Sequence, residues 1–247
     1  MNKKVFLPLA ALVLAALACS FSPNLSPLLS TSTPLPTDTP VPTYTFYPTY
    51  TSIPPTIAPS DQNILFQDDF SDVNSGWDRS SNERMSTDYA IGGYRINVIK
   101  EQWSAWSNPD QSFQNDVRIE VDATKIGGPD DNYLGVQCRY QDVDNYYYFD
   151  ISSDGYAGIG IVKAGNAVII SPSSGKMTSD SSVHRGAATN HIRADCIGTT
   201  LTLYINGNLA ATATDSSFTG GDVGVEAGTG KDGGTDILFT NFFVYKP

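Results

Sequence analysis

The stretch Tyr133–Lys163 determines the expected fold: YLGVQCRYQ (133–141), the turn DVDN, YYYFDISS (146–153), the turn DG, and YAGIGIVK (156–163). Apolar and other residues alternate in each run, and strand side chains point alternately to the two faces of a sheet. The pattern predicts three antiparallel strands with one buried face. The residues expected on that face are Leu134, Val136, Cys138, Tyr140, Tyr147, Phe149, Ile151, Ala157, Ile159 and Ile161.

The opposite face of this meander combines tyrosines, an arginine, a carboxylate and glycines. Tyrosine rings offer flat apolar surfaces with a polar tip, which suits a sugar ring, and Arg139 and Asp150 can donate to and accept from hydroxyls. The alternative is structural: the tyrosines pack under loops and Arg139 pairs with Asp150. A shift of one residue in register would invert the two faces. The residues predicted to bind carbohydrate are Gln137, Arg139, Tyr148, Asp150 and Tyr156, with Trp103 and Trp106 at the rim.

Short strand-like segments separated by Gly, Asn, Asp and Ser continue from about Asp61 to the C-terminus. No window has a sustained 3.6-residue period, so little helix is expected. This spacing predicts one all-β domain over 61–247, a two-sheet antiparallel jelly-roll sandwich. The expected strands are 64–70, 93–99, 104–107, 117–125, 133–140, 146–151, 157–163, 167–171, 191–197, 200–205, 209–214, 223–227 and 236–245.

The N-terminus has a secretory pattern. Lys3 and Lys4 precede an apolar run, Val5 to Leu17, that is too short to span a bilayer, and small residues lead to Cys19. This predicts a lipoprotein signal peptide at 1–18 and lipidation of Cys19, which would anchor the chain to a membrane face. The third residue before the cysteine is Ala16 rather than the leucine usual in lipoprotein signals. An ordinary signal peptide with an incidental cysteine is the alternative.

Residues 19–60 form a second region that begins with the cysteine. The part from 20 to 60 holds ten of the fifteen prolines, many Ser and Thr, and one charged residue, Asp38. Proline lacks the backbone donor that helices and sheets need, so we expect a disordered, extended linker.

The acidic composition of the predicted domain restricts the classes of molecule that it can bind. From Asp61 onward there are 13 Lys and Arg against 25 Asp and Glu, a net charge of −12. Nucleic acid is bound by neutralising phosphates with Lys and Arg, so we expect no nucleic-acid partner. Together with the N-terminal signal, the composition predicts an extracytoplasmic, lipid-anchored protein at the cell surface.

Cys138 and Cys196 are the two cysteines that remain if Cys19 carries lipid. Both occur at apolar positions of their strands, and an exported chain meets oxidising conditions in which disulfides persist. We predict a disulfide between them. Two buried free thiols are the alternative.

Several segments resemble the concanavalin A-like lectin/glucanase superfamily, and within it laminin-G-like and 3-keto-disaccharide-hydrolase-type domains of bacterial surface proteins. The likeness runs from about Asn63 to the C-terminus and depends most on the R-Y-x-D-x-x-N-Y-Y run and the L-x-L-Y-x-N-G-x hairpin. The resemblance implies two packed antiparallel sheets with the first and last strands side by side. The closing strand departs from the usual F-D-N-F, since it has Phe239-Thr240-Asn241-Phe242.

The glucanase motif of that superfamily, E-x-D-x-x-E, is incomplete. Its nearest match begins Glu120-Val121-Asp122 and ends in Lys125, so the second glutamate is missing. Aspartates on separate strands remain an alternative source of a carboxylate pair. The two histidines have no metal-type spacing. We expect no catalytic residues and no obligatory cofactor.

Calcium is an optional ligand in this interpretation. Two loops offer hard oxygen ligands, and laminin-G-like relatives often hold calcium at a loop rim, although Asp is also an ordinary turn residue. The candidate metal ligands are Asp130, Asp131, Asp142 and Asp144.

Three functions follow in order of preference. The first is a non-catalytic carbohydrate-binding module, the second a glycoside or 3-keto-disaccharide hydrolase-type enzyme or a lyase acting on a sugar derivative, and the third a structural or adhesive domain for protein partners.

Overall fold

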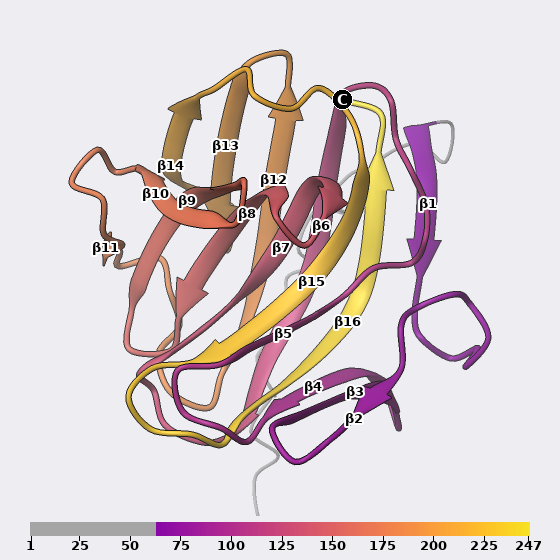
Figure 1. The fold of residues 1–247 in the computed structure, drawn as a ribbon, viewed down its shortest axis with the longest axis vertical. Coiled ribbons are helices and arrows are strands. Elements are labelled where there is room, and N and C mark those ends of the chain that lie inside the picture. The colour runs from indigo at the N-terminus through magenta and orange to yellow at the C-terminus, as the bar shows by residue number, and fades with distance from the viewer. Residues whose placement is uncertain (1–62) are drawn as a thin grey trace, which may run out of the picture. The chain divides into compact units, whose positions relative to one another are not determined.

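A computed structural model describes residues 63–247, and these residues form two antiparallel β-sheets that lie one over the other (Figure 1). The predicted all-β jelly-roll sandwich is confirmed. No helix within residues 63–247 has the length and hydropathy to cross a bilayer. The predicted signal peptide, lipidated Cys19 and linker lie outside the described residues.

One sheet has nine strands in the order β14-β13-β12-β6-β16-β4-β3-β2, with β1 also paired to β16. Its strands are β1 (Ile64–Asp68), β2 (Ser80–Ser81), β3 (Met85–Ala90), β4 (Gly93–Val98), β6 (Val117–Gly127), β12 (Thr189–Ile197), β13 (Thr200–Ile205), β14 (Asn208–Thr214) and β16 (Thr235–Tyr245).

The other sheet has seven strands in the order β10-β9-β8-β7-β15-β5, with β11 also paired to β9. Its strands are β5 (Ser104–Ser107), β7 (Asn132–Asp142), β8 (Asn145–Ser152), β9 (Tyr156–Lys163), β10 (Asn166–Ser171), β11 (Thr178–Ser179) and β15 (Asp222–Thr229).

The first and last strands lie side by side, as the resemblance implied, because β1 pairs with the final residues of β16. Asp68 ends β1 and accepts a hydrogen bond of 2.9 Å from the indole of Trp77. That indole packs edge-on against Phe242 of β16, with ring centroids 4.9 Å apart. One buried aromatic cluster therefore holds both ends of the described chain to the core.

The core lies between the sheets and follows the predicted two-residue period. Nine of the ten meander residues expected to be buried are buried, and only Tyr140 is not. The predicted disulfide is present between Cys138 on β7 and Cys196 on β12, with Cα atoms 6.9 Å apart. It therefore joins the two sheets through the core.

The outer face of the nine-stranded sheet carries a ladder of charged cross-strand pairs between β6 and β12. His191 Nδ1 lies 2.8 Å from Asp122 Oδ1, and Glu120 lies on its other side. Hydrogen bonds to Asp122 and then to Glu120 raise the pKa of His191 to about 9. The incomplete glucanase motif thus lies on β6, on this outer surface, where its acidic residues flank an imidazolium.

The two-residue period is interrupted after Cys138. The register of β7 shifts against both β8 and β15 at this point, and Arg139 has a φ of 53°. Such a bulge adds one residue and reverses the side-chain alternation. Tyr140, predicted for the core, therefore faces outward and packs against Tyr146, with ring centroids 5.5 Å apart. Arg139 turns inward instead of outward.

Candidate functional site

The outer face of the seven-stranded sheet holds a hollow of about 270 Å³. Its floor comes from the central strands β7, β8, β9 and β15, and one wall comes from β10 and the segment that follows it. The lining residues are Ser104, Tyr133, Tyr146, Tyr148, Asp150, Val162, Ala167, Ile169, Met177 and Glu226.

Two carboxyl groups meet on the floor of this hollow. Asp150 on β8 and Glu226 on β15 are both cross-strand partners of Gly135 on β7, which lies between them. A Cβ at Gly135 would lie 2.3 Å from Asp150 Oδ1, so only glycine leaves room for the carboxyl group there. The two carboxyl groups are neighbours, and each shifts the pKa of the other. Two strands thus supply a carboxyl pair that no single strand contains.

Gln137 fixes the orientation of this pair. Its side-chain amide donates to Glu226 Oε2 at 2.6 Å and accepts a longer hydrogen bond, 3.4 Å, from Asn108. Asn108 also donates to the carbonyl of Val223 at 2.7 Å. Because Asn108 donates through its amide nitrogen, Gln137 accepts through its oxygen and directs its own N–H groups at Glu226. An amide N–H directed at Glu226 favours its ionised form. Glu226 is therefore the carboxylate of the pair, and Asp150 is the partner that retains the shared proton.

Burial governs the acidity of the pair. Asp150 is 4% and Glu226 5% exposed. Burial, with the neighbouring Glu226 charge, holds the pKa of Asp150 well above its usual range. Burial also raises the pKa of Glu226, to about 7, although hydrogen bonds from Gln137 and Asp150 oppose the increase. The pair therefore holds a proton at a pH where isolated carboxyl groups are ionised.

Tyrosine rings surround the carboxyl pair. Tyr148 and Tyr133 each lean over the glycine that is their cross-strand partner, Gly160 and Gly228 respectively. A Cβ at either glycine would lie about 2 Å from the tyrosine ring. The glycines therefore allow the rings to lie across the sheet, and Tyr146 continues the aromatic surface 6.3 Å from Tyr148. Burial raises the pKa of each of these phenols, so they stay protonated.

The wall of the hollow is formed where β10 and β11 share one edge of β9. The chain between them leaves the sheet, and Met177 and Ile169 lie over Gly158. Their apolar side chains and the tyrosine rings cover the carboxyl pair without contributing any charge to it.

The structure brings together some of the predicted site residues and separates others. Tyr148 and Asp150 line the hollow, and Gln137 lies buried beside Glu226. Tyr156 is 43% exposed and is not part of the lining. Trp106 is the cross-strand partner of Glu226 but does not line the hollow, and Trp103 packs against the core under the cations of Arg84 and Lys100.

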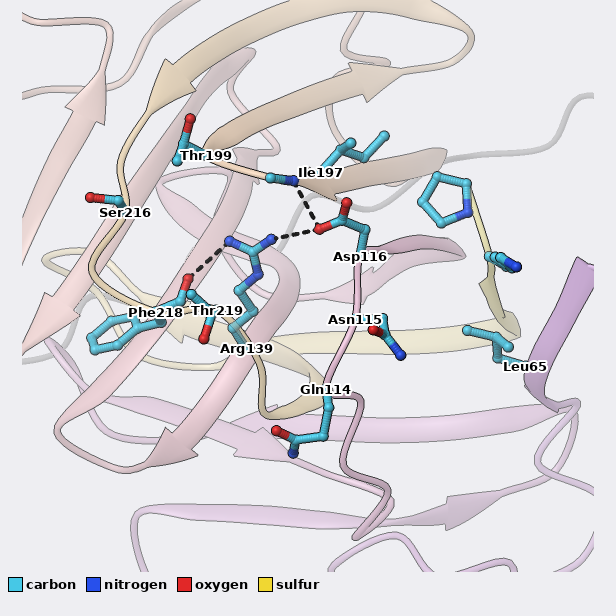
Figure 2. A pocket seen from close by; sticks show the side chains of 13 residues that line it. Leu65, Gln114, Asn115, Asp116, Arg139, Ile197, Thr199, Ser216, Phe218 and Thr219 are labelled. Atoms are coloured by element: carbon cyan, nitrogen blue, oxygen red, sulfur yellow. Dashed lines mark hydrogen bonds and ion pairs between the residues drawn. The ribbon is translucent and has the colours of Figure 1, made fainter.

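The placement predicted for Arg139 is wrong. Arg139 is 3% exposed and extends between the sheets at one end of the sandwich. Its guanidinium donates to the carbonyl of Phe218 at 2.9 Å and to Asp116 at 3.2 Å (Figure 2). It also donates to the carbonyl of Cys196 at 3.2 Å. The ion pair with Asp150 that the structural alternative proposed is absent as well, because the bulge turns the two side chains to opposite faces of the sheet.

Figure 2 also shows the larger hollow beside this arginine, about 930 Å³ in volume. Its lining includes Leu65, Ile197 and Phe218, and the one buried cation that reaches it is already paired with Asp116. Lys246 also lines this hollow but is exposed to solvent, so the hollow has no buried charge that lacks a partner. The site on the outer face of the seven-stranded sheet has a buried carboxyl pair instead.

The calcium ligands stay a prediction. The four aspartates lie in two separate turns, and Asp130 is paired with Lys125. Asp142 accepts hydrogen bonds from the backbone of Asp144 and the side chain of Asn145, as in an ordinary turn. Within residues 63–247, no group of three or more Asp, Glu, His or Cys side chains is arranged to hold a metal ion.

Glu226, Tyr133 and Tyr146 complete the site, and only the tyrosines were noted on the outer face from the sequence. A signal for Glu226 exists in the sequence Gly224-Val225-Glu226-Ala227-Gly228. Glu226 is two residues from each of these glycines, so all three residues lie on the same face of the strand. The glycines leave space above the sheet beside the glutamate.

Solved structures resemble this fold. No protein-family model and no curated protein sequence matches the chain. The carbohydrate-binding module CBM66 from Bacillus subtilis matches with a TM-score of 0.56 and 17% identity, over 70% of this chain and 96% of that one. A Bacillus licheniformis β-glucanase matches with a TM-score of 0.51 and 14% identity, over 74% and 97%. The Crh5 transglycosylase matches with a TM-score of 0.54 and 11% identity, over 73% and 83%.

These similarities define the class of fold. Residues 63–247 share the two-sheet antiparallel β-sandwich fold of these structures.

Proposed function

We propose that this chain is a carbohydrate-binding module on an extracytoplasmic lipoprotein, and that its site is the hollow around Asp150 and Glu226. The observation that carries the proposal is the combination, on one face, of tyrosine rings with buried oxygen acceptors. Sugar rings stack on the aromatic surfaces, and their hydroxyls donate to the carboxylate. The fold it shares with a carbohydrate-binding module supports a saccharide ligand.

Removing the ring of Tyr148 should weaken saccharide binding. A glycan array first identifies a ligand of the purified chain. We expect Tyr148→Ala to lower the affinity for that ligand by at least about fivefold, since stacking contributes about 1 kcal/mol or more. Isothermal titration calorimetry measures the change. Tyr204→Ala is the matched control, because Tyr204 packs under Arg193 on the outer face of the other sheet. Equal affinity of both variants and the parent protein would exclude this face as the binding site.

Glycoside hydrolysis is the second candidate, and the paired carboxyl groups favour it. Retaining glycosidases hold a nucleophile and an acid about 5 Å apart, so that the sugar lies between them. Asp150 and Glu226 instead flank the single residue Gly135, and each shifts the pKa of the other, so we rank binding above hydrolysis. Turnover of a bound oligosaccharide or oxidised disaccharide that disappears in Asp150→Asn would reverse this preference.

The lipid anchor is a separate part of the proposal. It is supported by the sequence pattern that ends at Cys19. We expect metabolic labelling with palmitate to mark the chain, and Cys19→Ser to abolish the label and shift the protein from the membrane fraction to the soluble fraction. An unlabelled parent protein that fractionates like Cys19→Ser contradicts the anchor and leaves the binding site untouched.

A further inference from the structure

The carboxyl pair in the hollow has a charge that its surroundings do not neutralise. Asp150 and Glu226 together carry one negative charge once Glu226 has ionised, which its pKa of about 7 places near neutral pH. Among the described residues, the side chain that donates to this pair is the neutral amide of Gln137. The residues that line the hollow include no Lys, Arg or His. Asp150 Oδ1 has no N–H or hydroxyl donor among the described residues. Buried charges normally have a partner, so the ionised pair favours a ligand that carries a positive charge.

The walls of the hollow suit a particular kind of cation. The faces of aromatic rings carry negative electrostatic potential and attract ammonium groups, and several rings around one position form a cation-binding cage. Tyr133, Tyr146 and Tyr148 line the hollow with the carboxyl pair, and Met177 and Ile169 form an apolar wall on one side. A metal ion would need several oxygen ligands, whereas an organic ammonium needs aromatic faces and one or two acceptors.

Size and charge restrict the ligand further. A volume of about 270 Å³ is at the small end for ligand pockets, which are typically about 300–1,000 Å³. It therefore suits one sugar residue rather than an extended chain. An acidic sugar would be repelled by the carboxylate, and a neutral sugar would offer it hydroxyl donors but no opposite charge.

We propose that the hollow recognises a sugar residue bearing a free amine, whose ammonium group lies between the tyrosine rings and pairs with Asp150 and Glu226. This inference rests on the proposed carbohydrate function and specifies the ligand class. It assigns each group a role: the rings and carboxylate hold the ammonium, and Gln137 orients Glu226 as a positioning residue.

The test uses three β-1,4-linked glucose-based oligosaccharides of equal length, which carry at carbon 2 an ammonium group, an N-acetyl group or a hydroxyl group. Calorimetry of the full-length chain at near-neutral pH should give an affinity for the aminated sugar at least about tenfold above that for either analogue. Tetramethylammonium serves as a fourth probe, without a sugar.

Because the whole chain is acidic, with a net charge of −11, a cationic sugar also needs a control for general attraction. Glu226→Gln and Tyr148→Phe should separate the contributions: the first removes the preference for the amine, and the second retains it because the ring persists. Glu83→Gln removes an exposed carboxylate from the turn between β2 and β3 of the other sheet and should leave affinity unchanged within about twofold.

The outcomes distinguish the two proposals. Equal affinity for all three sugars, lost in Tyr148→Ala, overturns the ammonium site and retains the carbohydrate function. Binding of tetramethylammonium alone, lost in Glu226→Gln, supports the ammonium site and overturns the carbohydrate function. Binding of the aminated sugar that Glu226→Gln leaves intact overturns the inference, and no binding of any probe overturns both.

Discussion

Replacing Cys138 and Cys196 together with alanine is expected to lower the free energy of unfolding by roughly 4 kcal/mol. The disulfide closes a sequence separation of 58 residues and connects β7 of one sheet to β12 of the other. In the chain-entropy model, a closed loop of this length restricts the unfolded chain and so raises its free energy. Native domains are stable by only about 5–15 kcal/mol, so the loss would remove a large part of the total. Equilibrium denaturation with urea, monitored by tryptophan fluorescence, measures it.

The reduced parent protein is the control for this prediction. Alanine also removes two buried sulfur atoms and leaves space in the core, whereas reduction keeps the side-chain volume. If the effect is mainly one of chain entropy, reduced parent and double variant should both unfold at markedly lower urea concentration than the oxidised protein. Titratable thiols at Cys138 and Cys196 in the unreduced, unfolded chain would contradict the prediction, as would a stability difference below about 1 kcal/mol.

The architecture could be predicted from the sequence because the signals for it are periodic. Alternation in β6, β7, β8 and β9 defined the buried face, and the Asn206-Gly207 turn defined one hairpin. The strand β3 (Met85–Ala90) was missed, since Ser86, Thr87 and Asp88 give no apolar alternation. It forms because its backbone pairs with β4, and this tertiary interaction is not encoded in local propensity.

The site was predicted less completely, for two physical reasons. The bulge at Arg139 needs a positive φ at a residue other than glycine, so no local residue type indicated that the alternation reverses there. The carboxyl pair depends on which strands are neighbours: Asp150 and Glu226 are 76 positions apart, and only the order β8-β7-β15 places them on either side of Gly135. A single sequence contains the residues of such a pair but not the pairing of their strands.

The isosteric change Glu226→Gln is expected to stabilise the protein above neutral pH. The pKa of Glu226 is raised by burial from its ordinary value of 4.5 to about 7. A group whose pKa is raised in the folded state contributes stability that is complete below the unfolded pKa and is lost as the pH rises through the folded pKa. The parent protein should therefore lose on the order of 3 kcal/mol between about pH 4.5 and 7.5 because of this group.

A glutamine at this position keeps the shape and does not titrate. Its carbonyl accepts from Gln137, and its amide has Asp150 as an acceptor. We expect Glu226→Gln and the parent protein to be nearly equally stable at pH 4.5, with the variant more stable at pH 8 by up to about 3 kcal/mol. Urea denaturation at several pH values measures the difference. His191 also has a raised pKa, about 9, but it lies on the other sheet and contributes equally to both proteins, so it cancels in the comparison.

Parallel pH profiles for the two proteins would show that Glu226 ionises normally and that the hollow is wetter than its burial indicates. If Glu226→Gln is more stable than the parent protein at pH 8 but no longer binds the ligand, the carboxylate of Glu226 is present in the hollow for binding rather than for stability. Sites that bind charged ligands often reduce the stability of the empty protein, because the groups that pair with the ligand are unpaired without it. On that reasoning Glu226 costs stability in the free protein and recovers it when a cation enters the hollow.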